Sequence, residues 1–152
     1  MQNFKVNGHE ILARLIKKGL EMEDSPHENP VLDPSQLAVM TGDDPSLAVE
    51  VIDIFRQQTD IWVRMLDADL PPDQWADAAH SLKGSALSVG AMRLADVCAK
   101  AEKLGRSAEE KPISRTEAAI CLSDVKDQIG PAIEASAKLA HQLSLSGSFS
   151  LS

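Results

Sequence analysis

Apolar side chains recur every three or four residues along most of this chain, as they do in helices that bury one face. The first such stretch covers residues 7–20, where the apolar positions are Ile11, Leu12, Leu15, Ile16 and Leu20. Residues 21–31 are mostly polar and contain Pro26 and Pro30, which is typical of a linker. The pattern predicts an amphipathic N-terminal helix that a linker separates from the rest of the chain.

Capping residues and prolines divide the remaining chain into further helices. Asp33-Pro34 and Asp44-Pro45 each place a helix-capping aspartate before a proline that suits the first helical turn. A capping box at residues 114–117 starts the last helix. The predicted helices cover about residues 34–40, 45–68, 73–89, 94–105 and 115–143.

The four longer helices predict an all-α protein built as an antiparallel up-and-down four-helix bundle, because short loops make consecutive helices neighbours. The two shorter N-terminal helices are accessory pieces. We divide the chain into an N-terminal helix and linker (1–31), the bundle (32–143) and a serine-rich tail (144–152) that we expect to be disordered. Pro131 lies inside the last helix and predicts a kink or break near Gly130.

The composition supports one domain with a substantial core. Of the 152 residues, 43% are hydrophobic and only 3% are aromatic, which favours helices over sheets. No run approaches about 18 apolar residues, and the N-terminus lacks the apolar core of a signal peptide. We therefore expect a cytoplasmic protein without a membrane partner. Cys98 and Cys121 are too few for a disulfide framework, and we expect both to be core thiols.

The charge is unevenly distributed along the chain. The formal net charge of −8 argues against nucleic acid as a partner, because phosphate contacts need basic surface. Residues 80–106 nevertheless contain five cations and two anions, a net charge of +3, so the remaining chain carries −11. A basic segment in an acidic protein predicts a surface that attracts an acidic partner.

One stretch of this basic segment combines residue types that can carry chemistry, His80-Ser81-Leu82-Lys83-Gly84-Ser85-Ala86. Positions i, i+3 and i+4 of a helix are neighbours, so His80, Lys83 and Gly84 share one face. The apolar seam of the same helix is centred about 140° from His80 at 100° per residue, which points the imidazole to solvent. The seam consists of Trp75, Ala79, Leu82, Ala86 and Val89.

This outward face has the composition that phosphoryl transfer needs. A neutral imidazole nitrogen supplies a lone pair, Lys83 can oppose the charge on phosphoryl oxygens, and Gly84 leaves room for a second protein to bring its group in line. Ala76, Leu87 and Ser88 surround the histidine, and we expect them to form a docking surface for that second protein.

The histidine stretch, with Val89-Gly90-Ala91 and Leu94 after it, resembles the signature of histidine-containing phosphotransfer (HPt) domains, H-x-L-K-G-S-A/S followed by G-A and L. The resemblance extends upstream to Trp75 and has its core at residues 76–102. It implies an antiparallel four-helix bundle of the kind used in bacterial two-component phosphorelays.

The resemblance also implies a role for each site residue. His80 would accept a phosphoryl group from the aspartate of a response-regulator receiver domain and pass it to another such domain. Lys83 would assist the phosphoryl group, and Gly84 would permit close approach. Family members often have Gln or Glu at the position of Glu102, which either holds the other imidazole nitrogen or is an ordinary surface carboxylate.

The implied partners are receiver domains and a hybrid or sensor histidine kinase. We expect the chain itself to be a monomeric phosphoryl carrier and not an enzyme, because it has no nucleotide site. It needs no cofactor of its own, since the Mg²⁺ ion would belong to the receiver domain.

A binding function without phosphoryl transfer is the alternative, because most exposed histidines are ordinary surface residues. In that alternative, the chain is a helical adaptor that docks partners through the surface around Leu87, and His80 is idle.

A second histidine segment, His9-Glu10-Ile11-Leu12, is superficially similar to the histidine box of sensor kinases. It lacks the expected proline a few residues later, and no glycine-rich ATP-binding segment follows, which argues against a kinase.

Overall fold

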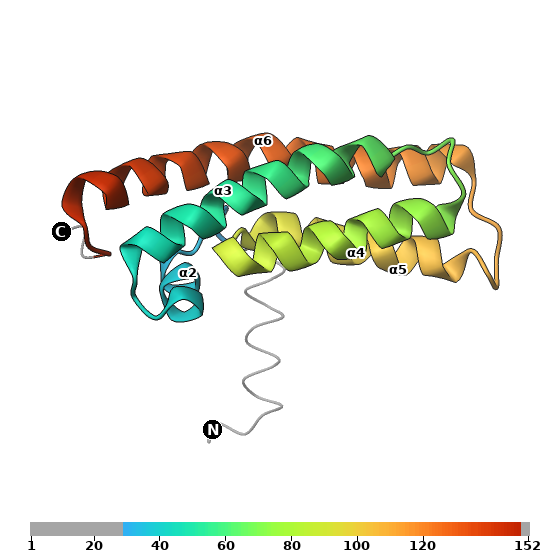
Figure 1. Cartoon of the computed structure of the whole chain (residues 1–152). Helices are drawn as coiled ribbons and strands as arrows, with labels where there is room; N and C mark the ends of the chain where they lie inside the picture. The colour runs from blue at the N-terminus through green and yellow to red at the C-terminus, as the bar shows by residue number, and fades with distance from the viewer. Residues whose placement is uncertain (1–28, 150–152) are drawn as a thin grey trace, which may run out of the picture.

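The computed structural model describes residues 29–149, and every regular element within them is helical (Figure 1). The predicted all-α class is thus confirmed, while the predicted helix at residues 7–20 lies outside the described residues. The elements are α2 (Pro34–Thr41), α3 (Pro45–Trp62), the 3-10 turn η1 (Val63–Met65), α4 (Pro72–Val89), α5 (Met92–Ser107) and α6 (Arg115–Ser146).

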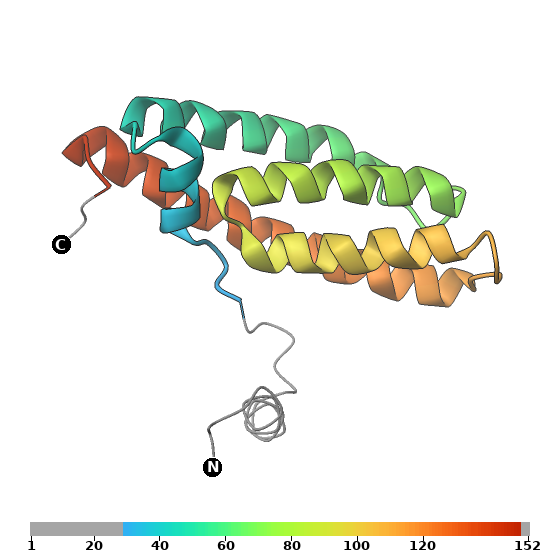
Figure 2. The same cartoon turned by 90° about the horizontal axis from the view of Figure 1, so that it is seen from below.

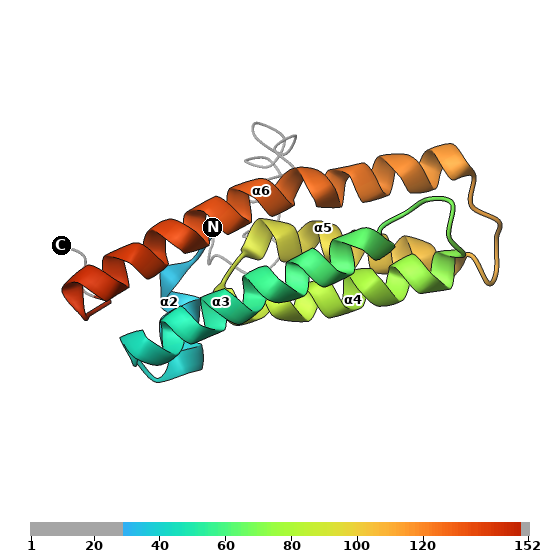
Figure 3. The same ribbon diagram turned by 45° about the horizontal axis from the view of Figure 1, so that its top comes forward.

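The long helices α3, α4, α5 and α6 form the predicted antiparallel four-helix bundle. Each packs against the next along the chain, and α6 returns to pack against α3, so the four enclose one core (Figures 1 and 3). Helices α3 and α6 extend beyond the turn between α4 and α5 (Figure 2). The short helix α2 packs against α3 and α4 at that end.

The helix starts are set by the predicted caps. The Asp33 carboxylate accepts a hydrogen bond from the Ser35 backbone N–H at 3.0 Å, and the Ser114 hydroxyl accepts one from the Glu117 N–H at 3.0 Å. Gly90 ends α4 with φ 83°, in the left-handed region that suits glycine. Its carbonyl accepts a hydrogen bond from the Asp33 N–H at 2.8 Å, which fixes the start of α2 at the end of α4.

Helix α6 differs from the expectation in two places. It runs through Pro131 without the break that was one of two predicted outcomes. Pro131 is exposed while the neighbouring Ala132 is buried, so core packing holds the helix although one backbone bond is missing. The helix also continues to Ser146, and Phe149 packs against the core. The prediction of a disordered tail is therefore wrong for residues 144–149, because apolar contacts extend beyond Leu143.

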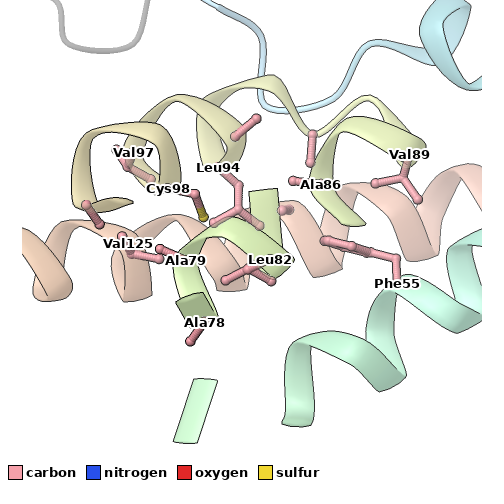
Figure 4. Close-up of a cluster of buried hydrophobic side chains, with 14 of the residues drawn as sticks. Phe55, Ala78, Ala79, Leu82, Ala86, Val89, Leu94, Val97, Cys98 and Val125 are labelled. Carbon is pink, nitrogen blue, oxygen red and sulfur yellow. The ribbon is translucent and has the colours of Figure 1, made fainter. Parts of the chain in front are cut away.

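The buried seam of α4 is the one the sequence predicts. All five seam residues have no exposed surface, and the small ones let α4 lie close to α5. In Figure 4, the side chains of Leu82 and Ala86 lie among those of Phe55 from α3 and Leu94 from α5. This packing fixes the rotation of α4, and with it the direction of every residue on the opposite face.

Helix α3 leaves three apolar residues at helical spacing outside the core. Leu47, Ile54 and Ile61 are all exposed, Ile54 to 54%. The face of α3 that packs on the bundle is formed instead by Ala48, Ile52, Phe55 and Thr59. The apolar positions of α3 cover more than one side of the helix, and only one side can meet α4 and α6.

Replacing Gly105 with alanine is expected to lower the free energy of unfolding by about 1–3 kcal/mol, the usual cost of overpacking. A Cβ at this position would lie 2.6 Å from the Ala76 Cβ, 2.8 Å from the Pro72 carbonyl oxygen and 2.9 Å from the Trp75 ring. Urea denaturation followed by circular dichroism measures the loss. Gly84→Ala is the matched control, because a Cβ there meets nothing within 4 Å. Equal effects of the two substitutions would contradict this packing.

Candidate functional site

Helix α4 presents His80 to solvent, as the helical wheel predicts. The His80 side chain is 62% exposed, while its neighbours Ala79 and Leu82 have no exposed surface. The seam of α4 is buried against α3 and α5, so the opposite side of the helix has to face outward. The imidazole is therefore accessible to another protein.

Glu102 of α5 contacts both His80 and Lys83 of α4. Its Oε2 lies 2.8 Å from His80 Nδ1, and its Oε1 lies 2.9 Å from Lys83 Nζ. The Glu102 side chain is only 19% exposed, because it lies between α4 and α5. Of the two alternatives for Glu102, the structure has the one in which it contacts the imidazole.

These contacts determine which imidazole nitrogen is free. The hydrogen bond from Lys83, together with the positive charge of Lys83, holds the pKa of Glu102 below its usual range against the opposing effect of burial. An ionised carboxylate only accepts hydrogen bonds, so Nδ1 has to carry the proton and donate it. The lone pair of a neutral His80 is then on Nε2, on the far side of the ring from Glu102.

Two further charged residues belong to the site and were not predicted. Arg106 Nη2 lies 2.6 Å from Asp77 Oδ1 and 3.9 Å from Glu102 Oε2. Arg106 lies just beyond the predicted helix 94–105, but α5 continues to Ser107 and places it one turn after Glu102. The i, i+4 spacing of Glu102 and Arg106, and the i−3 position of Asp77 relative to His80, are the signals that could have identified them.

The positive charge counted along residues 80–106 is not concentrated around His80. The two cations beside the histidine, Lys83 and Arg106, are each paired with a carboxylate, Glu102 or Asp77. Arg93 is turned toward the start of α2, where its Nε donates to the Asn29 carbonyl at 2.6 Å. The immediate surroundings of His80 are therefore balanced in charge.

Gly84 leaves open space next to the histidine. It is exposed, and a Cβ built on it meets no atom within 4 Å. Leu87 is 37% exposed, which fits the predicted docking surface. Ser88 is only partly exposed, and its hydroxyl donates to the Ser85 carbonyl at 2.6 Å. The described surface beside His80 thus has no projecting side chain at Gly84 and is apolar at Leu87.

The prediction that Ala76 lines this docking surface is wrong. Ala76 has no exposed surface, and its Cβ lies against the backbone of Gly105 in α5. The helical wheel places Ala76 close to His80, but α5 covers that edge of α4 because Gly105 has no side chain. The predicted surface around the histidine therefore loses one of its members.

Within residues 29–149, the cysteines and His141 form no second site. Burial raises the pKa of the Cys98 thiol to about 12, so this side chain stays protonated at neutral pH. His141 is exposed on α6. Residues 29–149 contain no group of three or more His, Cys, Asp or Glu placed to hold a metal ion. Nor does that part of the chain have a helix long and apolar enough to cross a membrane.

The fold and the site together define a four-helix bundle protein in which the exposed His80 is held at Nδ1 by a carboxylate of the next helix. The family model of the Hpt domain matches residues 50–135, more than half of the chain. Among solved structures, the chain is similar to the histidine phosphotransferase ShpA from Caulobacter crescentus, with 30% sequence identity and a TM-score of 0.55. That match covers 76% of this chain and 96% of ShpA. No curated protein matches the sequence.

The chain belongs to the Hpt domain family. Members of this family are phosphoryl carriers of two-component phosphorelays and work with receiver domains and kinases. Phosphorelay signalling is therefore the general function of this protein.

Proposed function

We propose that Nε2 of His80 accepts a phosphoryl group from the phosphoaspartate of a receiver domain and passes it to the aspartate of another. The observation that carries this proposal is the hydrogen bond between Nδ1 of the exposed His80 and Glu102. It assigns the proton to one nitrogen and leaves the other as a nucleophile on the open side of the ring.

The transfer is a displacement at phosphorus in which His80 is the nucleophile. The Nε2 lone pair forms the N–P bond while the bond between phosphorus and the aspartyl oxygen breaks. The electron pair of that bond stays on the aspartyl oxygen and regenerates the receiver carboxylate. The reverse reaction, with the aspartate of a second receiver as nucleophile, returns the imidazole to its starting state.

Glu102 stabilises the phosphorylated histidine. After transfer, the ring has a proton on Nδ1 and phosphorus on Nε2, so it carries a positive charge. The Glu102 carboxylate, 2.8 Å from Nδ1, opposes that charge. Lys83 keeps Glu102 ionised and provides a cation near the phosphoryl oxygens. In this proposal the Mg²⁺ ion belongs to the receiver domain, and the transfer requires no nucleotide on the carrier.

The proposal is tested by incubating the protein with a receiver domain that carries radiolabelled phosphate on its aspartate. Phosphate on a histidine is acid-labile and base-stable, so the label on this chain should be lost in acid and kept in base. Failure to label the chain with any receiver domain of the same organism would favour the helical adaptor that docks through Leu87.

Replacing Glu102 with glutamine is expected to slow phosphoryl transfer by about tenfold, or about 1.4 kcal/mol of transition-state stabilisation. The amide oxygen can still accept from Nδ1, but the negative charge opposite the ring is lost. Because the pKa of Glu102 is lowered, the carboxylate should stay ionised as the pH falls. Its effect on the transfer rate should therefore disappear only at a pH below the range in which glutamates usually titrate. Single-turnover kinetics from pH 5 to pH 8 measure the rate, and an unchanged rate in Glu102→Gln would contradict the role of the charge.

Replacing Lys83 with alanine is expected to slow transfer by about tenfold while the affinity for the receiver domain changes less than about twofold. Lys83 is mostly turned toward Glu102, with 29% of its side chain exposed, so it contributes little surface to docking. Rapid-quench kinetics give the rate, and titration calorimetry gives the affinity. An equal loss in rate and affinity would assign Lys83 to docking instead.

A further inference from the structure

A groove of about 420 Å³ lies between α5 and α6, which run side by side in Figure 2. Its apolar lining comes from Val97 and Leu104 of α5 and from Ile120 and Cys121 of α6. Ile120 is 61% exposed, although it lies next to this apolar surface. The groove is large enough to accept side chains of another segment and is not used by the phosphotransfer site.

The α6 border of the groove is acidic. Glu117, Asp124 and Asp127 line it and are all exposed, and Glu117 and Asp124 lie one turn before and one turn after Cys121. Lys100 of α5 is the one cation among the described lining residues. A segment that fits this groove should therefore combine an apolar face with positively charged side chains.

The described chain begins at one end of the same groove. The Asn29 carbonyl accepts a hydrogen bond from Arg93 Nε at 2.6 Å, and the Asn29 side chain donates to Asp96 Oδ2 at 2.5 Å. Both partners lie on α5, on the turn before the groove residues Val97 and Lys100. Asn29, the first described residue, is thus held next to the end of the groove.

Residues 7–20, in contrast to the acidic residues 21–28, have the composition that the groove requires. Residues 7–20 have a predicted apolar face and contain three cations, Arg14, Lys17 and Lys18, against one anion. A helix of 14 residues is about 21 Å long, and the α6 lining from residue 117 to residue 128 extends about 16 Å. The eight intervening residues can span up to about 27 Å, so they can deliver this segment to any position along the groove.

We propose that residues 7–20 dock as an amphipathic helix in the groove between α5 and α6 of the same chain. Their apolar residues contact the lining of the groove. Lys18, which lies beside Ile11 at the edge of the apolar face, faces the carboxylates of α6, while Arg14 and Lys17 lie on the outer face of the helix. Glu102 lies two residues from both Lys100 and Leu104, on the other side of α5, so the docked segment leaves His80 accessible. The docking is therefore independent of the proposed phosphoryl transfer.

Cys121 allows a direct test, because it lies in the groove and the other cysteine is fully buried. Three variants of the full chain each place a thiol on the predicted apolar face, namely Leu12→Cys, Leu15→Cys and Ile16→Cys. Glu10→Cys is the matched control on the opposite face of the predicted helix, with the same tether to the bundle. Burial raises the pKa of the Cys121 thiol, so mild oxidation is carried out at pH 8.5, and peptide mapping identifies the disulfide.

At least one apolar-face variant should form an intramolecular disulfide with Cys121 on the order of tenfold faster than Glu10→Cys. The introduced thiols of these variants have the same effective concentration near Cys121, because the same linker connects them to the bundle. They differ only in whether they face the groove or point away from it. Adding Asp124→Lys and Asp127→Lys to that variant should reduce the rate toward that of the control. Equal rates for all four thiols would overturn the proposal. A disulfide that joins two chains and increases with protein concentration would overturn it too, in favour of a second copy as the partner.

Discussion

Replacing His80 with glutamine is expected to abolish phosphoryl acceptance, with a loss of at least about 1,000-fold in rate, because an amide has no lone pair that can form the N–P bond. The fold should be unaffected. The side chain is 62% exposed, and its hydrogen bond to Glu102 can be replaced by one from the glutamine amide. We expect the free energy of unfolding to change by less than about 0.5 kcal/mol, which is typical of surface substitutions.

The measurement compares labelling by a phosphorylated receiver domain in wild type, His80→Gln and His141→Gln. His141 is an exposed histidine on α6, far from the site in sequence and without a role in the proposal, so its substitution controls for general effects of histidine loss. Only His80→Gln should lose the label. Normal labelling of His80→Gln would move the acceptor to another residue and remove the basis of the proposed function.

Replacing Gly84 with glutamine is expected to slow phosphoryl transfer by at least about 100-fold, or about 2.7 kcal/mol, while the protein stays folded. Gly84 follows His80 by four residues and lies one turn further along the same exposed face. Gly84 is exposed, and a Cβ built on it meets no atom within 4 Å, so a long side chain at this position projects into solvent. There it would stand where the receiver domain has to approach the imidazole.

Gly84→Ala separates access from helix stability. A Cβ at this position meets no atom within 4 Å, and alanine in a helix interior stabilises by about 1 kcal/mol relative to glycine. We expect the alanine variant to unfold at higher urea concentration and to transfer within about tenfold of wild type, since a methyl group reduces access only slightly. If Gly84→Gln transferred as fast as Gly84→Ala, close approach at this glycine would not be required.

Features that depend on the local sequence could be predicted well. The caps at Asp33 and Ser114, the end of α4 at Gly90 and the buried seam of α4 all follow from residues within one or two turns of each other. The outward direction of His80 follows in turn from that seam, because a helix has a fixed rotation per residue. One helix and its periodicity thus predict the most important property of the site.

Features that depend on how two helices meet could not be predicted with the same certainty. Ala76 lies only about 40° from His80 on the wheel, and it is buried because Gly105 brings α5 close to that edge of α4. The contact of Glu102 with both His80 and Lys83 requires the relative rotation and height of α4 and α5, which the sequence pattern does not specify. The same is true of the pair formed by Arg106 and Asp77.

The exposed residues of α3 illustrate a related limit. Leu47, Ile54 and Ile61 satisfy helical spacing as well as the residues that are buried. Periodicity alone identifies apolar faces, and only the positions of the neighbouring helices decide which apolar face is covered. The open groove between α5 and α6 is likewise a property of the assembled bundle, which is why its match to residues 7–20 emerges only from the structure.

In the proposed transfer, Nε2 of His80 carries the phosphoryl group while Nδ1 stays hydrogen-bonded to Glu102. Phosphorus NMR of the protein, phosphorylated by a receiver domain, identifies the nitrogen that is phosphorylated, because histidines phosphorylated at Nε2 and at Nδ1 give separate signals. We predict a single phosphohistidine signal of the Nε2 type that is absent from His80→Gln. A signal of the Nδ1 type, or one that persists in His80→Gln, would contradict the account.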